Sequence, residues 1–178
     1  MAHVILGLLL LRPQSLYDLV KNFEAAVSLL YSASSGSIRR ALETLLTGGL
    51  IEVDQVEPGA RGRKTYRVTD AGRDEFHAWM TGPMTGPDAE AAALPRLFFL
   101  GMLGPAERAE VLARVIARIE KDLGRFEEVG EKIDAEEIPE EFRDVFAFQR
   151  ATLDYGLASQ RFALQWFREL AERHASAG

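Results

Sequence analysis

The stretch from Ser32 to Gly72 constrains the fold more than any other part of the chain. Its first half predicts a helix. Hydroxyl side chains among residues 34–37 can cap the free amide groups of a first helical turn. The apolar residues that follow recur at helical spacing: Ile38, Ala41, Leu42 and Leu45. Gly48-Gly49 ends the helix, because glycine adopts the left-handed closing conformation without a steric penalty.

The second half of this stretch has the period of two strands. Apolar and polar residues alternate over residues 51–54 and again over residues 66–69. The turn sequence between the two runs ends in three cations: Arg61, Arg63 and Lys64. A helix followed by a hairpin with a basic tip is the layout of a winged helix-turn-helix. We therefore expect that unit in the N-terminal half of the chain.

Composition excludes several kinds of site. The chain has no cysteine, which rules out disulfides, thiolate zinc sites and cysteine nucleophiles. The longest apolar run, Val4 to Leu11, is far shorter than the roughly 20 residues of a membrane span. It also lacks the flanking features of a signal peptide. We expect a cytoplasmic protein with no membrane partner.

The net charge of -6 is unevenly distributed. Residues 1–80 carry as many cations as acids, so the excess of acids lies in residues 81–178. Most of the N-terminal cations fall between Arg39 and Arg73. A local cluster of cations in the N-terminal half and an excess of acids in the C-terminal half are compatible with a DNA-binding protein that approaches DNA in one orientation.

Residues that begin or end helices indicate the domain organisation. Ser15 is predicted to cap a helix that precedes the stretch from Ser32 to Gly72, and Thr69 is predicted to cap the helix that follows the hairpin. A repeated Thr-Gly-Pro unit cannot continue a helix and marks a linker. The expected fold is mainly α with a small β-hairpin. Its parts are a winged-helix DNA-binding domain at 1–80, a linker at 81–87 and a helical dimerisation domain at 88–178.

The last helix, expected to run to about Glu172, carries two apolar stripes. One stripe, which we assign to dimerisation, consists of Phe142, Phe146, Leu153, Leu157, Leu164 and Phe167. The other consists of Phe148, Tyr155, Phe162 and Trp166. A helix with two apolar faces must be covered on two sides. A homodimer through the C-terminal helices is the expected cover, and a larger core within one chain is the alternative.

These motifs, in their order and spacing, resemble the PadR family of bacterial transcriptional regulators over essentially the whole chain. The family's Ser-Gly-Tyr-Asp-Leu motif corresponds to Ser-Leu-Tyr-Asp-Leu at 15–19. Its approach to the recognition helix corresponds to Tyr-Ser-Ala-Ser at 31–34. The helix end and strand start correspond to Gly-Leu-Ile at 49–51. Two positions depart from the family: Leu16 replaces a glycine and Arg39 replaces a tyrosine.

The wing and the rear half extend the resemblance. The wing and the helix start after it correspond to Arg-Lys-Thr-Tyr-Arg-Val-Thr-Asp-Ala-Gly-Arg at 63–73. The Leu-Phe-Phe-Leu run at 97–100 resembles the subgroup with a longer, multi-helix C-terminal domain. The resemblance implies a homodimer that binds double-stranded DNA. Because some members bind aromatic compounds, it also implies a small-molecule effector of unknown identity.

Candidate DNA contacts follow from how helix-turn-helix proteins dock. The start of the recognition helix enters the major groove, where arginine can donate two hydrogen bonds to guanine or contact phosphates. A glycine-flanked wing tip can approach a phosphate ridge closely. We predict DNA contacts from Tyr17, Ser35, Ser37, Arg39, Arg40, Arg61, Arg63 and Lys64. The alternatives are a solvated helix face with capping serines, an ordinary polar turn, and packing of Tyr17.

The sequence also bears on ligand, metal and catalytic sites. Phe162 and Trp166 are candidates to line a flat-ligand pocket, with core packing as the alternative. The three histidines are scattered without ligand spacing, so we expect no metal and no cofactor. The sequence has no phosphate-binding loop, nucleophile elbow or paired-acid constellation, so we expect no enzyme.

The sequence therefore favours a dimeric DNA-binding regulator, a repressor by our hypothesis. The alternative is a protein-interaction module whose winged helix has lost DNA binding. The net charge of -6 and the replaced tyrosine at Arg39 motivate this alternative. The basic wing, which such a module does not need, distinguishes the two.

Overall fold

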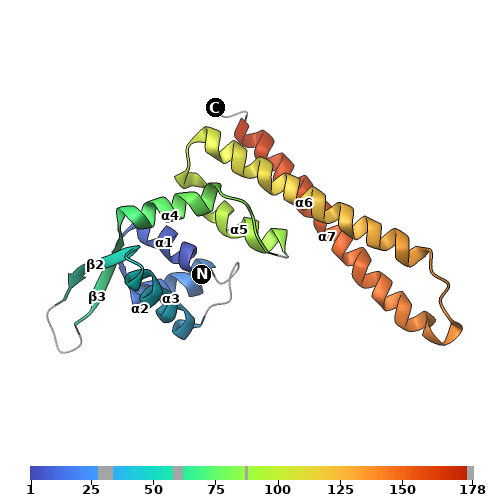
Figure 1. Ribbon diagram of the computed structural model, residues 1–178, viewed down its shortest axis with the longest axis horizontal. Coiled ribbons are helices and arrows are strands. Elements are labelled where there is room, and N and C mark those ends of the chain that lie inside the picture. The colour runs from blue at the N-terminus through green and yellow to red at the C-terminus, as the bar shows by residue number, and fades with distance from the viewer. Residues whose placement is uncertain (28–33, 58–61, 87, 176–178) are drawn as a thin grey trace. The chain divides into compact units, whose positions relative to one another are not determined.

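The computed structural model describes residues 1–27, 34–57, 62–86 and 88–175 (Figure 1). The chain divides into two compact units. The first is Met1–Gly82 together with Leu94–Leu100, and the second is Pro83–Ala93 together with Gly101–Gly178. The predicted fold class, mainly α with a small sheet, is confirmed. In this division Leu94–Leu100 belongs with the N-terminal unit, and the predicted linker at 81–87 is divided between the two units after Gly82. The predicted domain boundaries stay a prediction.

The first unit is built around an apolar helix. Its elements are α1 (Ala2–Leu11), β1 (Gln14–Ser15), α2 (Leu16–Asn22), a π-helical turn (Phe23–Val27), α3 (Ser35–Thr47), β2 (Ile51–Val56), β3 (Lys64–Val68) and α4 (Asp70–Thr81). α1 packs against α3, α4 and β3, which bury it on nearly all sides. The ring of Phe99 lies directly over Gly7, where an added Cβ would come within 2.6 Å of the ring.

The predicted helix boundaries rest on local hydrogen bonds. The Ser15 side chain accepts from the Asp18 amide, and the Asp18 carboxylate accepts from the Ser15 amide, which forms a capping box at the start of α2. Ser34 caps α3 and Thr69 caps α4. After α3 the chain turns at Gly49, whose φ of 69° is in the left-handed region. The predicted caps and the predicted glycine stop are confirmed.

The sheet has three strands in the order β1-β3-β2, all antiparallel. The predicted hairpin is the β2–β3 pair, in which Ile51 faces Val68 and both are buried. The register shifts by one residue between Val53 and Gln55, which leaves a bulge. The sequence did not predict β1, because two residues are too few to show an alternation.

The second unit contains two long helices. α5 (Ala89–Phe99), of which residues 94–99 belong to the first unit, and a 3₁₀ turn (Leu100–Met102) precede α6 (Pro105–Asp134). A second 3₁₀ turn (Glu140–Phe142) leads into α7 (Arg143–Ala175), which lies alongside α6 in the opposite direction (Figure 1). Pro105 begins α6 and the break around Pro139 separates it from α7, as predicted.

The two stripes of α7 have different surroundings. Leu157, Leu164 and Phe167 of the first stripe are buried in the chain, on the side of α7 that packs against α6. Three ion pairs connect the same two helices: Arg150 with Asp134, Arg161 with Glu127 and Arg168 with Glu120. The first stripe therefore serves mainly as internal core, although Phe142 at its start is exposed. Leu157, Leu164 and Phe167 are therefore covered within one chain and unavailable to a second copy. Dimer contacts from Phe142, Phe146 and Leu153, which are not buried, stay a prediction.

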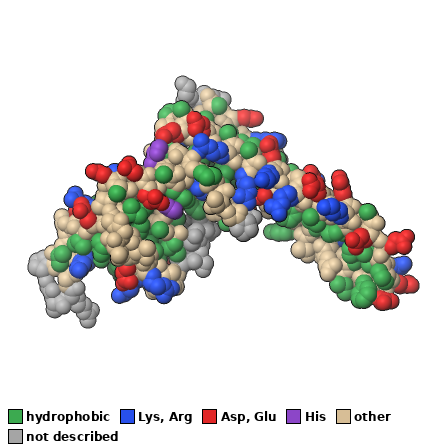
Figure 2. All heavy atoms as spheres, in the orientation of Figure 1, with side chains coloured by type: hydrophobic (Ala, Val, Ile, Leu, Met, Phe, Trp, Pro, Cys, Tyr) green, Lys and Arg blue, Asp and Glu red, His purple; other side chains and the backbone are tan. Residues whose placement is uncertain are grey.

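The second stripe is the apolar surface that α7 leaves open. The exposed fractions are 77% for Phe148, 76% for Tyr155, 70% for Phe162 and 37% for Trp166. Figure 2 shows hydrophobic side chains on the surface of the part formed by α6 and α7. We call Phe148, Tyr155, Phe162 and Trp166 the α7 seam.

Candidate nucleic-acid interface

α3 presents a polar face to solvent because its apolar face is fixed in the core. Ile38, Leu42 and Leu45 are buried, and they orient the helix. Arg39 and Arg40 are exposed, one turn from the helix start. In the part of the chain that the structure describes, neither guanidinium forms an ion pair. Both arginines therefore keep their donors available to an outside acceptor.

The predicted serines at this helix start differ in their roles. Ser35 is exposed and has no structural task that the structure records among the described residues. Ser37 is half-buried, and its hydroxyl donates to the carbonyl oxygen of Ser34 at 2.7 Å. Ser37 therefore stabilises the first turn of α3, while its oxygen retains acceptor capacity.

The base of the wing is tied to α2 by an ion pair. One terminal nitrogen of Arg63 donates to both carboxylate oxygens of Asp18, at 2.9 and 2.7 Å. Asp18 also accepts from the hydroxyl of Ser15 at 2.6 Å. The Ser15 hydrogen bond, with a smaller contribution from Arg63, lowers the pKa of Asp18 to about 2. The structure thus brings the wing cation Arg63 against the start of α2.

Tyr17 lies beside this ion pair and is 61% exposed. The ammonium of Lys21, one turn further along α2, lies 4.9 Å from the centre of the Tyr17 ring. Lys21 is a surface cation that our sequence reasoning missed. The spacing of four residues from Tyr17 on one helix was the available signal.

The remaining wing residues are divided by what the structure describes. Lys64 is exposed at the outer end of β3, opposite Val56. Arg61 lies outside the described residues, as does the Tyr31-Ser32-Ala33 approach to α3. Arg67 pairs across the hairpin with Glu52 at 2.7 Å, so it supports the sheet.

Asp18→Asn is expected to lower the stability of the N-terminal unit by about 1 kcal/mol at neutral pH, because it weakens the capping box. An acid whose pKa is depressed stabilises the fold above its unfolded pKa of 3.8 and loses that effect as pH falls towards about 2. The variant should therefore lose part of the stability change between these two pH values. Urea denaturation at pH 7, 4 and 2.5 measures it.

Asp70→Asn is the matched control, because Asp70 is exposed in the first turn of α4 and lies 3.9 Å from Arg73. Its effect should be close to zero. Equal effects of the two substitutions would contradict a structural role for the Asp18 cluster.

The predicted ligand-lining pair of the second unit lies on the open side of α7. Phe162 and Trp166 belong to the α7 seam and are exposed. The Trp166 ring packs edge-on against the Phe167 ring, with 5.1 Å between the ring centres. Their lining of a ligand pocket remains a prediction.

Metal and membrane features are absent from the described part of the chain. No group of three or more His, Asp or Glu side chains is arranged to hold a metal ion there. His3 stacks on Trp79 at 4.9 Å and pairs with Glu75. Among the same residues, no helix has the length and apolar character needed to cross a membrane.

Two family models match the chain, one in each half. Residues 5–78 match the transcriptional regulator PadR-like family. Residues 92–175 match the virulence activator alpha C-term family. These segments contain α3, the wing and the α6–α7 pair.

Individual relatives are similar at low identity. The negative transcriptional regulator PadR of Bacillus subtilis is 22% identical over 170 residues, which cover 94% of this chain and 93% of the relative. A crystal structure of Bacillus subtilis PadR in complex with operator DNA is 21% identical, with 97% and 98% of the two chains covered and a TM-score of 0.43. The Vibrio cholerae virulence activator AphA is 22% identical, with 99% of each chain covered and a TM-score of 0.40.

The segments matched by the family models and by the PadR relative include the helices and the hairpin that the structure contains. The sequence resemblance to PadR regulators is confirmed. Residues 5–78 therefore match the PadR-like family of transcriptional regulators, and the chain as a whole is similar to a PadR regulator over 94% of its length.

Proposed function

We propose that this protein is a homodimeric repressor that binds a specific double-stranded operator in the cytoplasm. The observation that carries the proposal is the exposed Arg39-Arg40 pair at the start of a helix whose other face is fixed in the core. The Bacillus subtilis relative is a negative transcriptional regulator, which supports repression.

The N-terminal unit is proposed as the DNA-binding domain. α3 would enter the major groove, with Ser35, Arg39 and Arg40 towards base edges and phosphates. Tyr17, Lys21 and Lys64 would contact the backbone, and Arg61 is retained as a contact on sequence grounds. Arg63 is already held by Asp18, so a phosphate contact from it requires sharing or exchanging that carboxylate. We therefore expect less binding energy from Arg63 than from the unpaired arginines of α3.

The α6–α7 pair is proposed as the dimerisation domain, with a second copy of the chain on the α7 seam. Phe148, Tyr155 and Phe162 are seven residues apart, and Trp166 follows four residues later. This spacing keeps one line of apolar side chains facing a partner helix, as in a coiled coil. Large exposed aromatic side chains in one continuous line mark interaction surfaces.

Phe162→Glu is expected to convert the dimer to a monomer, because it places a charge in the middle of the α7 seam. The mass in solution should fall by half, as measured by light scattering coupled to size exclusion. Helix content should stay unchanged, since Phe162 is 70% exposed and contributes little to the core of one chain.

Ala147→Glu is the control for this substitution, because residue 147 is also exposed on α7 but lies to one side of the seam. It should leave the mass unchanged. A dimer that survives Phe162→Glu would move the interface away from the seam.

The direct test of the proposed function is DNA binding across a salt series. The probe is DNA upstream of the protein's own gene, or the product of random-site selection if that DNA has no site. Fluorescence anisotropy should show saturable binding that survives competitor DNA and weakens linearly in a plot of log affinity against log salt. Equal affinity for every sequence, or none at low salt, would overturn the proposal.

A further inference from the structure

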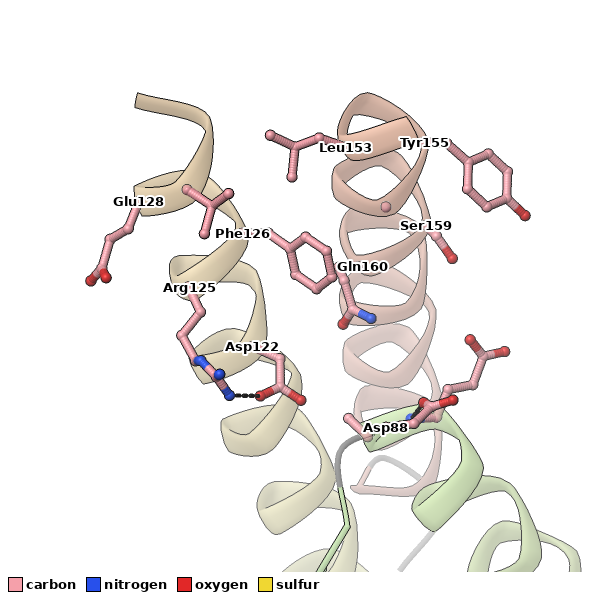
Figure 3. Close-up of a pocket in the computed structure, with 13 residues that line it drawn as sticks. Asp88, Asp122, Arg125, Phe126, Glu128, Leu153, Tyr155, Ser159 and Gln160 are labelled. Atoms are coloured by element: carbon pink, nitrogen blue, oxygen red, sulfur yellow. Dashed lines mark hydrogen bonds and ion pairs between the residues drawn. The ribbon is translucent and has the colours of Figure 1, made fainter. Parts of the chain in front are cut away.

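The second unit contains a pocket that shares one residue, Tyr155, with the α7 seam and contains none of the proposed DNA contacts. It has a volume of about 620 Å³ and lies between the start of α5, the middle of α6 and the middle of α7 (Figure 3). Phe126 points from α6 towards α7, and Gln160 points from α7 towards α6. Phe126, Val129 and Leu153 supply an apolar wall. This volume suits a small organic molecule.

One polar atom in this pocket lacks a partner. Gln160 Oε1 is buried and accepts no hydrogen bond, and it is the one such buried side-chain atom in the described residues. Native proteins satisfy nearly all buried polar atoms. Because Gln160 lines the cavity, a donor inside it can satisfy this acceptor when the Gln160 amide turns towards it.

Two carboxylates of the wall, those of Asp122 and Asp88, are also acceptors. Asp122 is buried; its Oδ2 accepts from Arg118 at 2.9 Å, and its Oδ1 is 4.0 Å from Arg125. Asp88 Oδ1 accepts from the amides of Glu90 and Ala91. A carboxylate can accept more bonds than these two groups receive. The wall therefore offers acceptors to a ligand that brings donors.

The charge of the wall agrees with this requirement. Its charged residues are Asp88, Glu90, Asp122 and Glu128 against Arg125. An acid excess around an apolar wall favours a cation with an apolar body. Phe126 adds a ring face that can contact such a cation.

We propose that this pocket binds a small organic ammonium, a protonated amine that carries an aromatic or branched aliphatic body. The ammonium donates to Gln160 Oε1 and to the carboxylates of Asp122 and Asp88, and the body contacts Phe126 and Leu153. This site differs from the Phe162–Trp166 pair, and its binding does not depend on DNA.

The pocket is also connected to the segment before α5. The Arg118 guanidinium that contacts Asp122 donates to the carbonyl oxygens of Met84 and Gly86, at 3.1 and 2.7 Å. A cation that competes for Asp122 would therefore act on the anchor of the segment through which the chain continues to the N-terminal unit.

Calorimetric titration of the full chain with three matched probes tests the proposal. 4-Phenylbutylammonium, 4-phenylbutyrate and 4-phenylbutanol share one body and differ in the head group. At neutral pH we expect the ammonium to bind at least about tenfold more tightly than the carboxylate or the alcohol. The mass of the chain is measured in the same buffer, because Tyr155 and Ser159 at the pocket edge lie on or next to the α7 seam.

Two variants localise the site. Gln160→Met removes the open acceptor at similar size, so it should raise the thermal midpoint of the free protein and weaken ammonium binding. Asp88→Asn keeps the helix cap and removes one charge, so it should also weaken binding. Glu110→Gln, on the exposed side of α6, is the charge-matched control and should leave binding unchanged.

Any of three results overturns the proposal: carboxylate binding as tight as ammonium binding, no ammonium binding, or ammonium binding that Gln160→Met leaves unchanged. None of these results depends on an operator. A failure of DNA binding would leave the ammonium titration intact, so the two proposals fail separately.

Discussion

Replacing Gly72 with alanine is expected to lower the unfolding free energy of the N-terminal unit by about 3 kcal/mol or more. Gly72 lies in the first turn of α4, where an added Cβ would be 2.0 Å from the carbonyl oxygen of Leu50. That oxygen already accepts from the Thr69 amide at 3.1 Å. Because the obstacle is hydrogen-bonded backbone, the start of α4 must move and the cap at Thr69 must weaken.

The measurement uses the position of the two tryptophans. Trp79 belongs to the N-terminal unit and Trp166 to the other unit. In a Trp166→Phe background, urea denaturation followed by fluorescence reports on the N-terminal unit alone. The midpoint for Gly72→Ala should fall well below that of the parent.

Gly36→Ala is the matched control in the same unit. Its added Cβ would be 3.9 Å from the nearest atom, the Ser34 hydroxyl oxygen. Alanine in a helix is favoured over glycine, so this variant should be slightly more stable than the parent, by up to about 1 kcal/mol. If Gly72→Ala were as stable as Gly36→Ala, the close approach of α4 to Leu50 would be wrong.

Sequence reasoning succeeded where structure depends on neighbouring residues. Ser15, Ser34 and Thr69 cap the helices that their local sequence predicted. Gly49 ends α3 and Pro105 begins α6 for reasons of backbone geometry that any chain shares. Such features need no knowledge of distant contacts.

It failed where distant residues meet. Asp18 and Arg63 are 45 positions apart, and nothing in either local pattern indicates their ion pair. β1 exists because β3 is available to pair with it. Leu94–Leu100 follows the predicted linker, yet it packs with the N-terminal unit because Phe99 fits over Gly7.

The stripes of α7 show the same limit in a different form. The periodicity correctly indicated two apolar faces, but it could not say which face α6 covers. Leu157 and Leu164 became core, while Phe148 and Phe162 stayed exposed. The pocket at Gln160 was also missed, because its lining comes from three helices.

Replacing Arg39 and Arg40 together with alanine is expected to weaken operator binding at least about a hundredfold, since a good arginine–base contact contributes about 1–3 kcal/mol. Both side chains are exposed and unpaired within the described residues, so the fold should survive. Circular dichroism and the mass in solution check this, and anisotropy with operator and unrelated DNA measures the affinity.

Arg73→Ala combined with Arg114→Ala removes the same net charge from exposed sites that already have acidic partners. This control should lose far less affinity. If the Arg39/Arg40 double variant binds the operator as tightly as the control does, these two arginines do not recognise the operator.

The slope of log affinity against log salt concentration then distinguishes two roles for Arg39 and Arg40. If Arg39 and Arg40 contact bases, their loss should reduce the ratio of operator to unrelated-DNA affinity and leave the slope nearly unchanged. If they contact phosphates, affinity should fall for all sequences and the slope should drop by about one per arginine. Arg39 stands where the resemblance places a tyrosine, so a base contact from its guanidinium would use donors that a tyrosine at this position lacks. Asp18 already neutralises Arg63 in the wing. We therefore expect the preference for one DNA sequence over another to depend on α3 and not on the wing.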